Sequence, residues 1–214
     1  FMVTTVLFDL DGTLTDPYEG ITNAAMYALK RIGREREGKD GLESFIGPPL
    51  LDSFREVCGL GEEEARRAFV YYREYYAEKG KFENRVYEGI PEMLERLCER
   101  GLRLAVATSK PEIFSKQIIE RFGLARYIPF VCGATLDNSR VQKADVIRYA
   151  LETLGIGDAA EAVMVGDRKH DVLGARANNL SCIGVLYGYG SEQELRDAGA
   201  KVFAAAPSDL PALI

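Results

Sequence analysis

The sequence predicts an α/β fold, in which a doubly wound parallel sheet carries an inserted α-helical cap domain. Two features of the 214-residue chain predict it. From residue 91 onward, short apolar runs alternate with stretches of helical periodicity, a pattern typical of a parallel sheet covered on both faces. Residues 17 to about 85 interrupt this alternation with helical segments. We therefore expect a core domain formed by residues 1–16 and 86–214, and a helical cap domain formed by residues 17–85.

The core elements follow one another in regular alternation. Strands are predicted at residues 6–8, 102–108, 129–134, 162–167, 182–186 and 201–204. Helices are predicted at residues 91–101, 111–122, 144–154, 191–198 and 208–213, with one more after residue 167. Pro91 and Gly101 bound the first of these helices, because proline suits the first helical position and glycine ends a helix readily.

The inserted segment begins at an Asp16–Pro17 pair, which predicts a helix start with aspartate as its cap. The helices predicted within the segment cover residues 17–33, 50–60 and 62–80. The last of them carries four tyrosines, at positions 71, 72, 75 and 76. We expect these rings to lie in a core between helices rather than to form a binding surface.

The composition is that of an ordinary soluble globular protein, with 47% hydrophobic and 28% charged residues. A formal net charge of −6 argues against a protein that binds nucleic acid through its overall field. The four cysteines form no CxxC pair, so we expect buried free thiols in a reducing cytoplasm. No signal peptide or membrane-length apolar run is apparent, and we take Met2 rather than Phe1 as the natural start.

Polar residues cluster at the carboxyl ends of the predicted strands, the edge of an open parallel sheet where ligands bind. Two aspartates follow the first strand, and comparable positions after other strands or before a helix carry a threonine, a serine, a lysine and two more aspartates. The residues are Asp9, Asp11, Thr108, Ser109, Lys143, Asp167 and Asp171. Converging carboxylates are unstable without compensation, and Mg2+ prefers oxygen ligands. We therefore expect Mg2+ and a phosphoryl group at this edge.

Four motifs, in order, resemble those of the haloacid dehalogenase-like (HAD) hydrolases. They are "DLDGTL" at 9–14, "ATSKP" at 107–111, "QKADVI" at 142–147 and "GDRKHD" at 166–171. The helical insertion after the first motif most resembles the subgroup that contains the phosphoglycolate phosphatases. The resemblance covers essentially the whole chain.

The resemblance implies a phosphatase that works through an aspartyl phosphate. Asp9 is then the nucleophile and Asp11 the general acid and base. The implied Mg2+ ligands are Asp9, Asp11 (through its backbone carbonyl), Asp167 and Asp171. The implied phosphate-binding residues are Thr108, Ser109 and Lys143. Two of these positions have a simpler interpretation, since Ser109 could cap the following helix and Lys143 could be a solvated lysine at a helix start.

The implied substrate is a small phosphate monoester, with phosphoglycolate as first candidate, and we expect no nucleic-acid or membrane partner. A 5′-nucleotidase and a β-phosphoglucomutase-like enzyme are alternatives, and a receiver-type phospho-acceptor switch is the alternative outside the enzymes. A substrate carboxylate would need a cation from the cap domain. The candidates are Arg55, Arg73, Lys79 and Lys81. The "YGYG" stretch at 187–190 is interpreted as a flexible turn.

Overall fold

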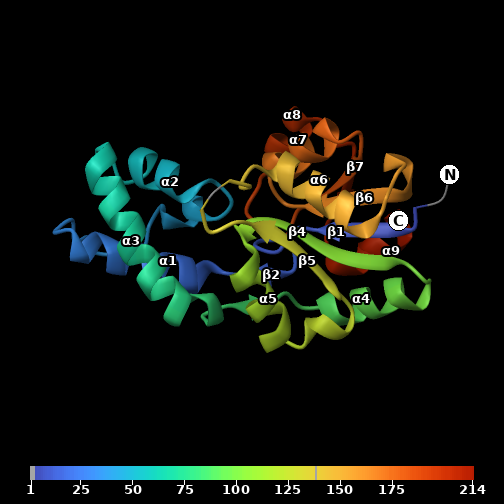
Figure 1. Ribbon diagram of the computed structural model, residues 1–214, viewed down its shortest axis with the longest axis horizontal. Coiled ribbons are helices and arrows are strands. Elements are labelled where there is room, and N and C mark those ends of the chain that lie inside the picture. The colour runs from blue at the N-terminus through green and yellow to red at the C-terminus, as the bar shows by residue number, and fades with distance from the viewer. Residues whose placement is uncertain (1–2, 138) are drawn as a thin grey trace. The chain divides into compact units, whose positions relative to one another are not determined.

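The structure, a computed structural model, describes residues 3–137 and 139–214 (Figure 1). Contacts within the chain define two compact units. The segment up to Asp16 joins Val86–Ile214 in one unit, which we name the core domain. Pro17–Arg85 forms the other, which we name the helical unit. The predicted start at Met2 lies outside the described residues.

The core domain is built on a six-stranded parallel sheet with the strand order β5-β4-β1-β6-β7-β8, which confirms the predicted α/β fold. The strands are β1 (Thr5–Phe8), β4 (Arg103–Pro111), β5 (Phe130–Ala134), β6 (Ala162–Gly166), β7 (Ser181–Val185) and β8 (Val202–Ala204). In the centre, Leu7 lies opposite Ala105 of β4 and Met164 of β6. The first strand of the chain is therefore flanked by two neighbours that come much later in the sequence.

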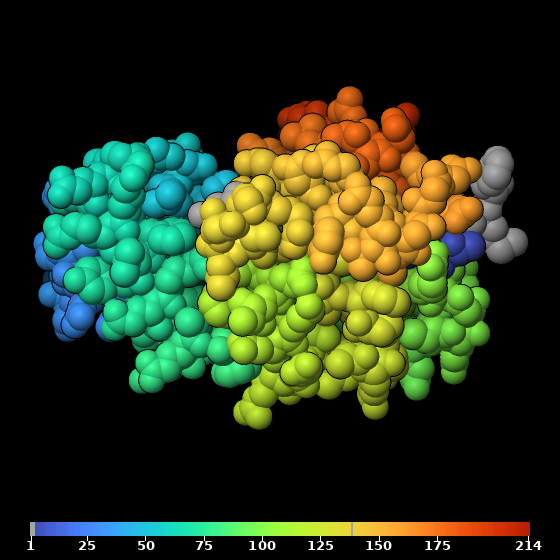
Figure 2. All heavy atoms as spheres, in the orientation of Figure 1, coloured from blue at the N-terminus to red at the C-terminus, as the bar shows by residue number. Residues whose placement is uncertain are grey.

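Helices cover both faces of this sheet (Figure 1). One face carries α4 (Ile90–Glu99), α5 (Glu112–Arg121) and the short α9 (Leu210–Leu213). The other carries α6 (Lys143–Leu154) and α7 (Lys169–Ala177), and α8 (Glu192–Ala198) packs beside α7. In Figure 2, little of the blue segment that contains β1 is visible on the side of the core domain that is turned toward the viewer.

The apolar run of β1 is explained by burial on two sides. Val6 and Phe8 pack with α4 and α5, whereas Leu7 between them packs with α6 and α7. Side chains of a strand point alternately to opposite faces, so a central strand covered on both faces has to be apolar at every position.

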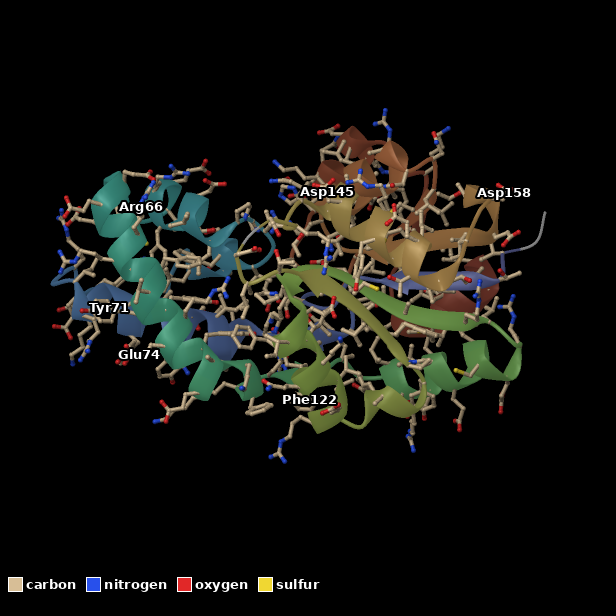
Figure 3. All side chains as sticks on the ribbon, viewed as in Figure 1. Arg66, Tyr71, Glu74, Phe122, Asp145 and Asp158 are labelled. Atoms are coloured by element: carbon tan, nitrogen blue, oxygen red, sulfur yellow. The ribbon has the colours of Figure 1, made fainter. Side chains whose placement is uncertain are left out.

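The helical unit consists of α1 (Tyr18–Arg31), α2 (Leu50–Glu56) and α3 (Glu62–Glu78). Tyr72 and Tyr76 are buried as expected; they stack with ring centroids 5.5 Å apart, and Tyr72 meets the edge of Phe54. Tyr71 and Tyr75 are half-buried on the same helix. Figure 3 shows the position of Tyr71 on α3.

Several short elements complete the fold. The 3-10 helices are η1 (Leu42–Phe45), η2 (Gly80–Phe82), η3 (Leu124–Arg126), η4 (Ala159–Glu161) and η5 (Pro207–Asp209). A two-stranded sheet pairs β2 (Thr15–Asp16) with β3 (Arg85–Val86). Within the described residues, no helix combines the length and apolarity needed to cross a membrane.

The structure corrects two local predictions. Asp16 does not cap α1, because it lies in β2 and its carboxylate accepts a hydrogen bond from the Tyr189 hydroxyl. The Asp16 carboxylate therefore binds Tyr189, which is distant in sequence, instead of the backbone at the start of α1. The prediction of buried thiols is wrong for Cys98, which is exposed, although Cys132 is buried and the other two cysteines are half-buried.

The packing of α4 gives a test of the core. Replacing the fully buried Leu94 by alanine (Leu94→Ala) should lower the free energy of unfolding by about 2–5 kcal/mol, because it leaves a cavity against the sheet. Leu173→Ala on α7, where the leucine is 47% exposed, should change it by less than about 0.5 kcal/mol. Urea unfolding of both variants measures the contrast, and equal losses would contradict this packing.

Candidate active site

The candidate site begins at the turn that follows β1. Asp9 is the first residue after the strand, and Asp11 comes two residues later. The turn closes through backbone hydrogen bonds, with the Gly12 amide donating to the Thr15 carbonyl at 2.8 Å and the Leu14 amide donating to the Leu10 carbonyl at 2.9 Å. This turn fixes the backbone on which both aspartates lie.

Two glycines allow later segments to approach this turn closely. Gly12 has a φ of 86°, and a Cβ atom there would lie 2.2 Å from an Asp167 carboxylate oxygen. A Cβ atom at Gly166 would lie 2.2 Å from the carboxyl carbon of Asp171. Both contacts are far shorter than van der Waals distance, so any side chain at either position would displace a carboxylate of the site.

Three buried carboxylates converge beside the turn. Asp9, Asp167 and Asp171 are 7%, 0% and 1% exposed, and each offers an oxygen within 4.8 Å of the others. Asp167 follows β6, and Asp171 lies on the first turn of α7. Neighbouring strands and one helix start therefore bring these negative charges into a single small volume.

Lys143, the first residue of α6, is buried among these carboxylates. Its Nζ atom lies 2.7 Å from Asp9 Oδ1 and 2.8 Å from Asp171 Oδ1, and it donates a hydrogen bond to the Ala107 carbonyl at 3.1 Å. Burial opposes its charge, but Asp171 and Asp9 outweigh burial and raise the pKa of Lys143. The interpretation of Lys143 as a solvated lysine is therefore wrong.

Asp167 and Asp171 are also held by the backbone and by one hydroxyl. Asp167 accepts hydrogen bonds from the Tyr189 amide at 2.8 Å and from the Thr13 hydroxyl at 3.3 Å. Asp171 accepts one from the Arg168 amide at 3.0 Å. These contacts orient both side chains without adding a formal positive charge.

The protonation of the cluster reflects its crowding. Burial, followed by the charges of Asp171 and Asp9, raises the pKa of Asp167 to about 8. Burial and the charge of Asp9 outweigh Lys143 and raise the pKa of Asp171 to about 6. In the absence of a further cation, the fold therefore relieves its excess negative charge by retaining a proton.

The residues present fit a hard divalent cation. Among the residues that the structure describes, the buried Asp9 Oδ1 and Asp171 Oδ1 accept no hydrogen bond, although both lie at ion-pair distance from Lys143. One ammonium group also leaves three carboxylates with two excess negative charges when all are ionised. Carboxylate oxygens without hydrogen-bond partners, in a group with excess negative charge, are the donor set that Mg2+ prefers.

Asp11 has its own partner, Lys110, which the sequence analysis did not assign a role. Lys110 Nζ lies 2.7 Å from Asp11 Oδ1 and 2.6 Å from Asp11 Oδ2, and the lysine side chain is 6% exposed. Burial raises the pKa of Asp11 even though Lys110 opposes the shift. Lys110 lies on β4, just after Thr108. Its position at the carboxyl end of a predicted strand could have identified it as a candidate site residue.

Thr108 and Ser109 occupy the same end of β4. Thr108 is buried, and its Oγ1 atom accepts a hydrogen bond from the Lys110 amide at 3.2 Å. Ser109 is half-buried. Its alternative role as a helix cap is wrong, because α5 follows Pro111 and no side chain caps it.

Comparisons with known proteins agree with this geometry. The family profile described as haloacid dehalogenase-like hydrolase matches residues 6–185. A 5′-nucleotidase of Pseudomonas aeruginosa is 49% identical over 191 residues, which cover 89% of this chain and 86% of that protein. Phosphoglycolate phosphatase 1 of the same species is 32% identical over 193 residues, which cover 86% and 70%.

Two further proteins extend the comparison. Tyrosine-protein kinase PtkA of Mycobacterium tuberculosis is 42% identical over 185 residues, which cover 86% of this chain and 62% of that protein. The crystal structure of a predicted phosphatase from Clostridium acetobutylicum matches with a TM-score of 0.94 and 48% identity. That match covers 100% of this chain and 98% of the other.

The raised pKa of Asp167 predicts how pH and Mg2+ act on stability. Between about pH 4 and pH 8 the folded, metal-free protein retains a proton that the unfolded chain releases, so its stability should fall as pH rises through this range. Because Mg2+ needs ionised carboxylates, the rise in Tm that Mg2+ causes should be larger at about pH 8 than at about pH 5.5.

Thermal unfolding with and without Mg2+ measures this difference. Asp167→Asn should remove most of the Mg2+ effect. Asp145→Asn should keep it, since Asp145 forms a surface ion pair with Arg148 on α6 (Figure 3). A Mg2+ effect of the same size at both pH values, or one that survives Asp167→Asn, would contradict the assignment of Asp167 to a cation site.

Proposed function

We propose that this chain, which belongs to the haloacid dehalogenase-like hydrolase family, hydrolyses small phosphate monoesters through an aspartyl phosphate on Asp9 and requires Mg2+. Whatever its preferred substrate, the protein is a phosphatase, that is, a phosphoric monoester hydrolase. The observation that carries the proposal is the convergence of three buried aspartates on Lys143, beside the turn that bears Asp11. A receiver-type switch is not favoured by these relatives.

Asp9 is the nucleophile in this proposal. Its carboxylate oxygen forms a bond to phosphorus as the bond from phosphorus to the ester oxygen breaks, and water later cleaves the resulting acyl phosphate. The ion pair with Lys143, at 2.7 Å, holds the carboxylate in one orientation. Lys143 also supplies positive charge for phosphoryl oxygens, with Thr108 as a hydroxyl donor beside it.

Asp11 is the general acid and base in this proposal. It donates a proton to the leaving oxygen and then accepts one from the attacking water. Burial raises the pKa of Asp11, a shift in the direction that the first step needs. Lys110 opposes the protonated form while it contacts Asp11, so Asp11 must lose this contact, wholly or in part, before it donates its proton.

The residues that would hold Mg2+ are Asp9, Asp167 and Asp171, with the backbone carbonyl of Asp11. The bound ion would offset the repulsion between the anionic nucleophile and the anionic phosphoryl group.

The nucleophile assignment is tested by Asp9→Asn. The amide cannot form the acyl phosphate, so turnover should fall by on the order of 10⁴-fold or more, measured as inorganic phosphate released in the presence of Mg2+. Asp158→Asn, at an exposed cap of η4, should leave turnover unchanged. Near-normal turnover by Asp9→Asn would show that another group attacks phosphorus.

For the substrate, we propose a nucleoside 5′-monophosphate in preference to phosphoglycolate. The support is relative similarity, since the 5′-nucleotidase relative is 49% identical and the phosphoglycolate phosphatase 32%. Contacts within the helical unit also argue against Arg55 as the cation that would bind a substrate carboxylate. Arg55 already pairs with Asp52 and, at 2.7 Å, with Glu62.

A panel of phosphate monoesters tests this choice. The value of kcat/KM for nucleoside 5′-monophosphates should exceed that for phosphoglycolate by about tenfold or more, a difference of roughly 1.4 kcal/mol in transition-state binding. Arg55→Ala should leave KM for phosphoglycolate within about twofold of the unmodified protein, because its charge is already neutralised. Phosphoglycolate preferred by tenfold would reverse the substrate proposal and leave the Asp9 chemistry intact.

A further inference from the structure

The YGYG segment, residues 187–190, is not the flexible turn that its sequence suggests. Its two tyrosines are half-buried, and Tyr187 contacts Tyr87 edge-on with ring centroids 5.3 Å apart. The Tyr187 hydroxyl donates a hydrogen bond to the Thr13 carbonyl at 3.0 Å. The segment is therefore anchored on the turn that carries the catalytic aspartates.

The glycines of the segment show how close this approach is. A Cβ atom at Gly188 would lie 2.4 Å from the Gly12 carbonyl oxygen, and one at Gly190 would lie 1.9 Å from the Asp167 carbonyl oxygen. No side chain fits at either position unless the backbone shifts. Close backbone contact with both the first turn and Asp167 is thus built into the sequence.

Two polar contacts of Tyr189, which lies between these glycines, have different roles. Its backbone amide holds Asp167 Oδ2 at 2.8 Å, and its hydroxyl donates to Asp16 Oδ1. Asp16 is 7% exposed, so its carboxylate depends on hydrogen bonds inside the protein. Asp16 directly follows Thr15, whose backbone pairs with that of Asp11 across the turn.

We propose that Tyr189 is a positioning residue, whose hydroxyl fixes through Asp16 and Thr15 the backbone on which Asp11 presents its carboxyl group. This inference rests on the proposed function of Asp11 as the acid and base. Asp16 is also the last core residue before the helical unit begins at Pro17. The tie therefore holds the turn in place where the chain leaves the core domain.

The proposal separates two steps of the reaction. Tyr189→Phe keeps the aromatic ring and the amide that holds Asp167, but it removes the hydroxyl contact with Asp16 and so loosens the turn that presents the Asp11 carboxyl group. Proton donation by the Asp11 side chain to the leaving oxygen should suffer much more than attack by Asp9. Substrates with good leaving groups need little protonation, so their hydrolysis should be spared.

The experiment compares kcat for 4-nitrophenyl phosphate and for the best alkyl phosphate of the panel, in the presence of Mg2+. For Tyr189→Phe we expect a loss of about tenfold with the alkyl ester and less than about twofold with the aryl ester. Tyr127→Phe, the same chemical change elsewhere in the core domain, should alter neither substrate.

Equal losses with both esters, or no loss with either, would overturn the positioning role. If Tyr189→Phe does not fold, Asp16→Ala removes the same contact from the other side, and the same two outcomes decide. Failure of the proposed function has a different signature. In that case the unmodified protein hydrolyses neither ester, or its activity survives Asp9→Asn.

Discussion

The mutual repulsion of three buried carboxylates is the constraint on which the core domain depends. Asp9, Asp167 and Asp171 lie within one small volume, and Lys143 brings a single positive charge among them. Excess charge of this kind costs several kcal/mol unless a proton or a cation relieves it. A fold that retains such a cluster has an arrangement suited to a divalent cation and, beside it, to an anionic phosphoryl group.

Close backbone packing is the means by which this cluster is built. The carboxylates come from the end of β1 and from the short connection between β6 and α7, so two segments distant in sequence must meet with almost no space between them. Gly12, Gly166 and Gly188 make that approach possible, because a Cβ atom at any of them would collide with the site. Glycine at these points is a requirement of the chemistry as much as of the turns.

Much of the fold could be predicted because a parallel sheet covered on both faces leaves a simple pattern of apolar strands and helical periods. The same logic placed Asp9 and Asp167 at one edge. Contacts between loops left no such pattern. Lys110 pairs with Asp11, and Asp16 binds the Tyr189 hydroxyl instead of capping a helix. Both contacts depend on how distant segments are placed in the folded chain. The preferred substrate is likewise set by details that periodicity does not record.

Locating the cation would test most directly whether the three buried aspartates form a metal site. Crystals grown with Mn2+, which accepts the same oxygen ligands as Mg2+, would reveal it by anomalous scattering. We expect one strong peak in the core domain, bordered by the carboxylates of Asp9 and Asp167. A strong peak elsewhere, or no peak while the carboxylates stay in place, would contradict the claim that this cluster is a metal and phosphoryl centre.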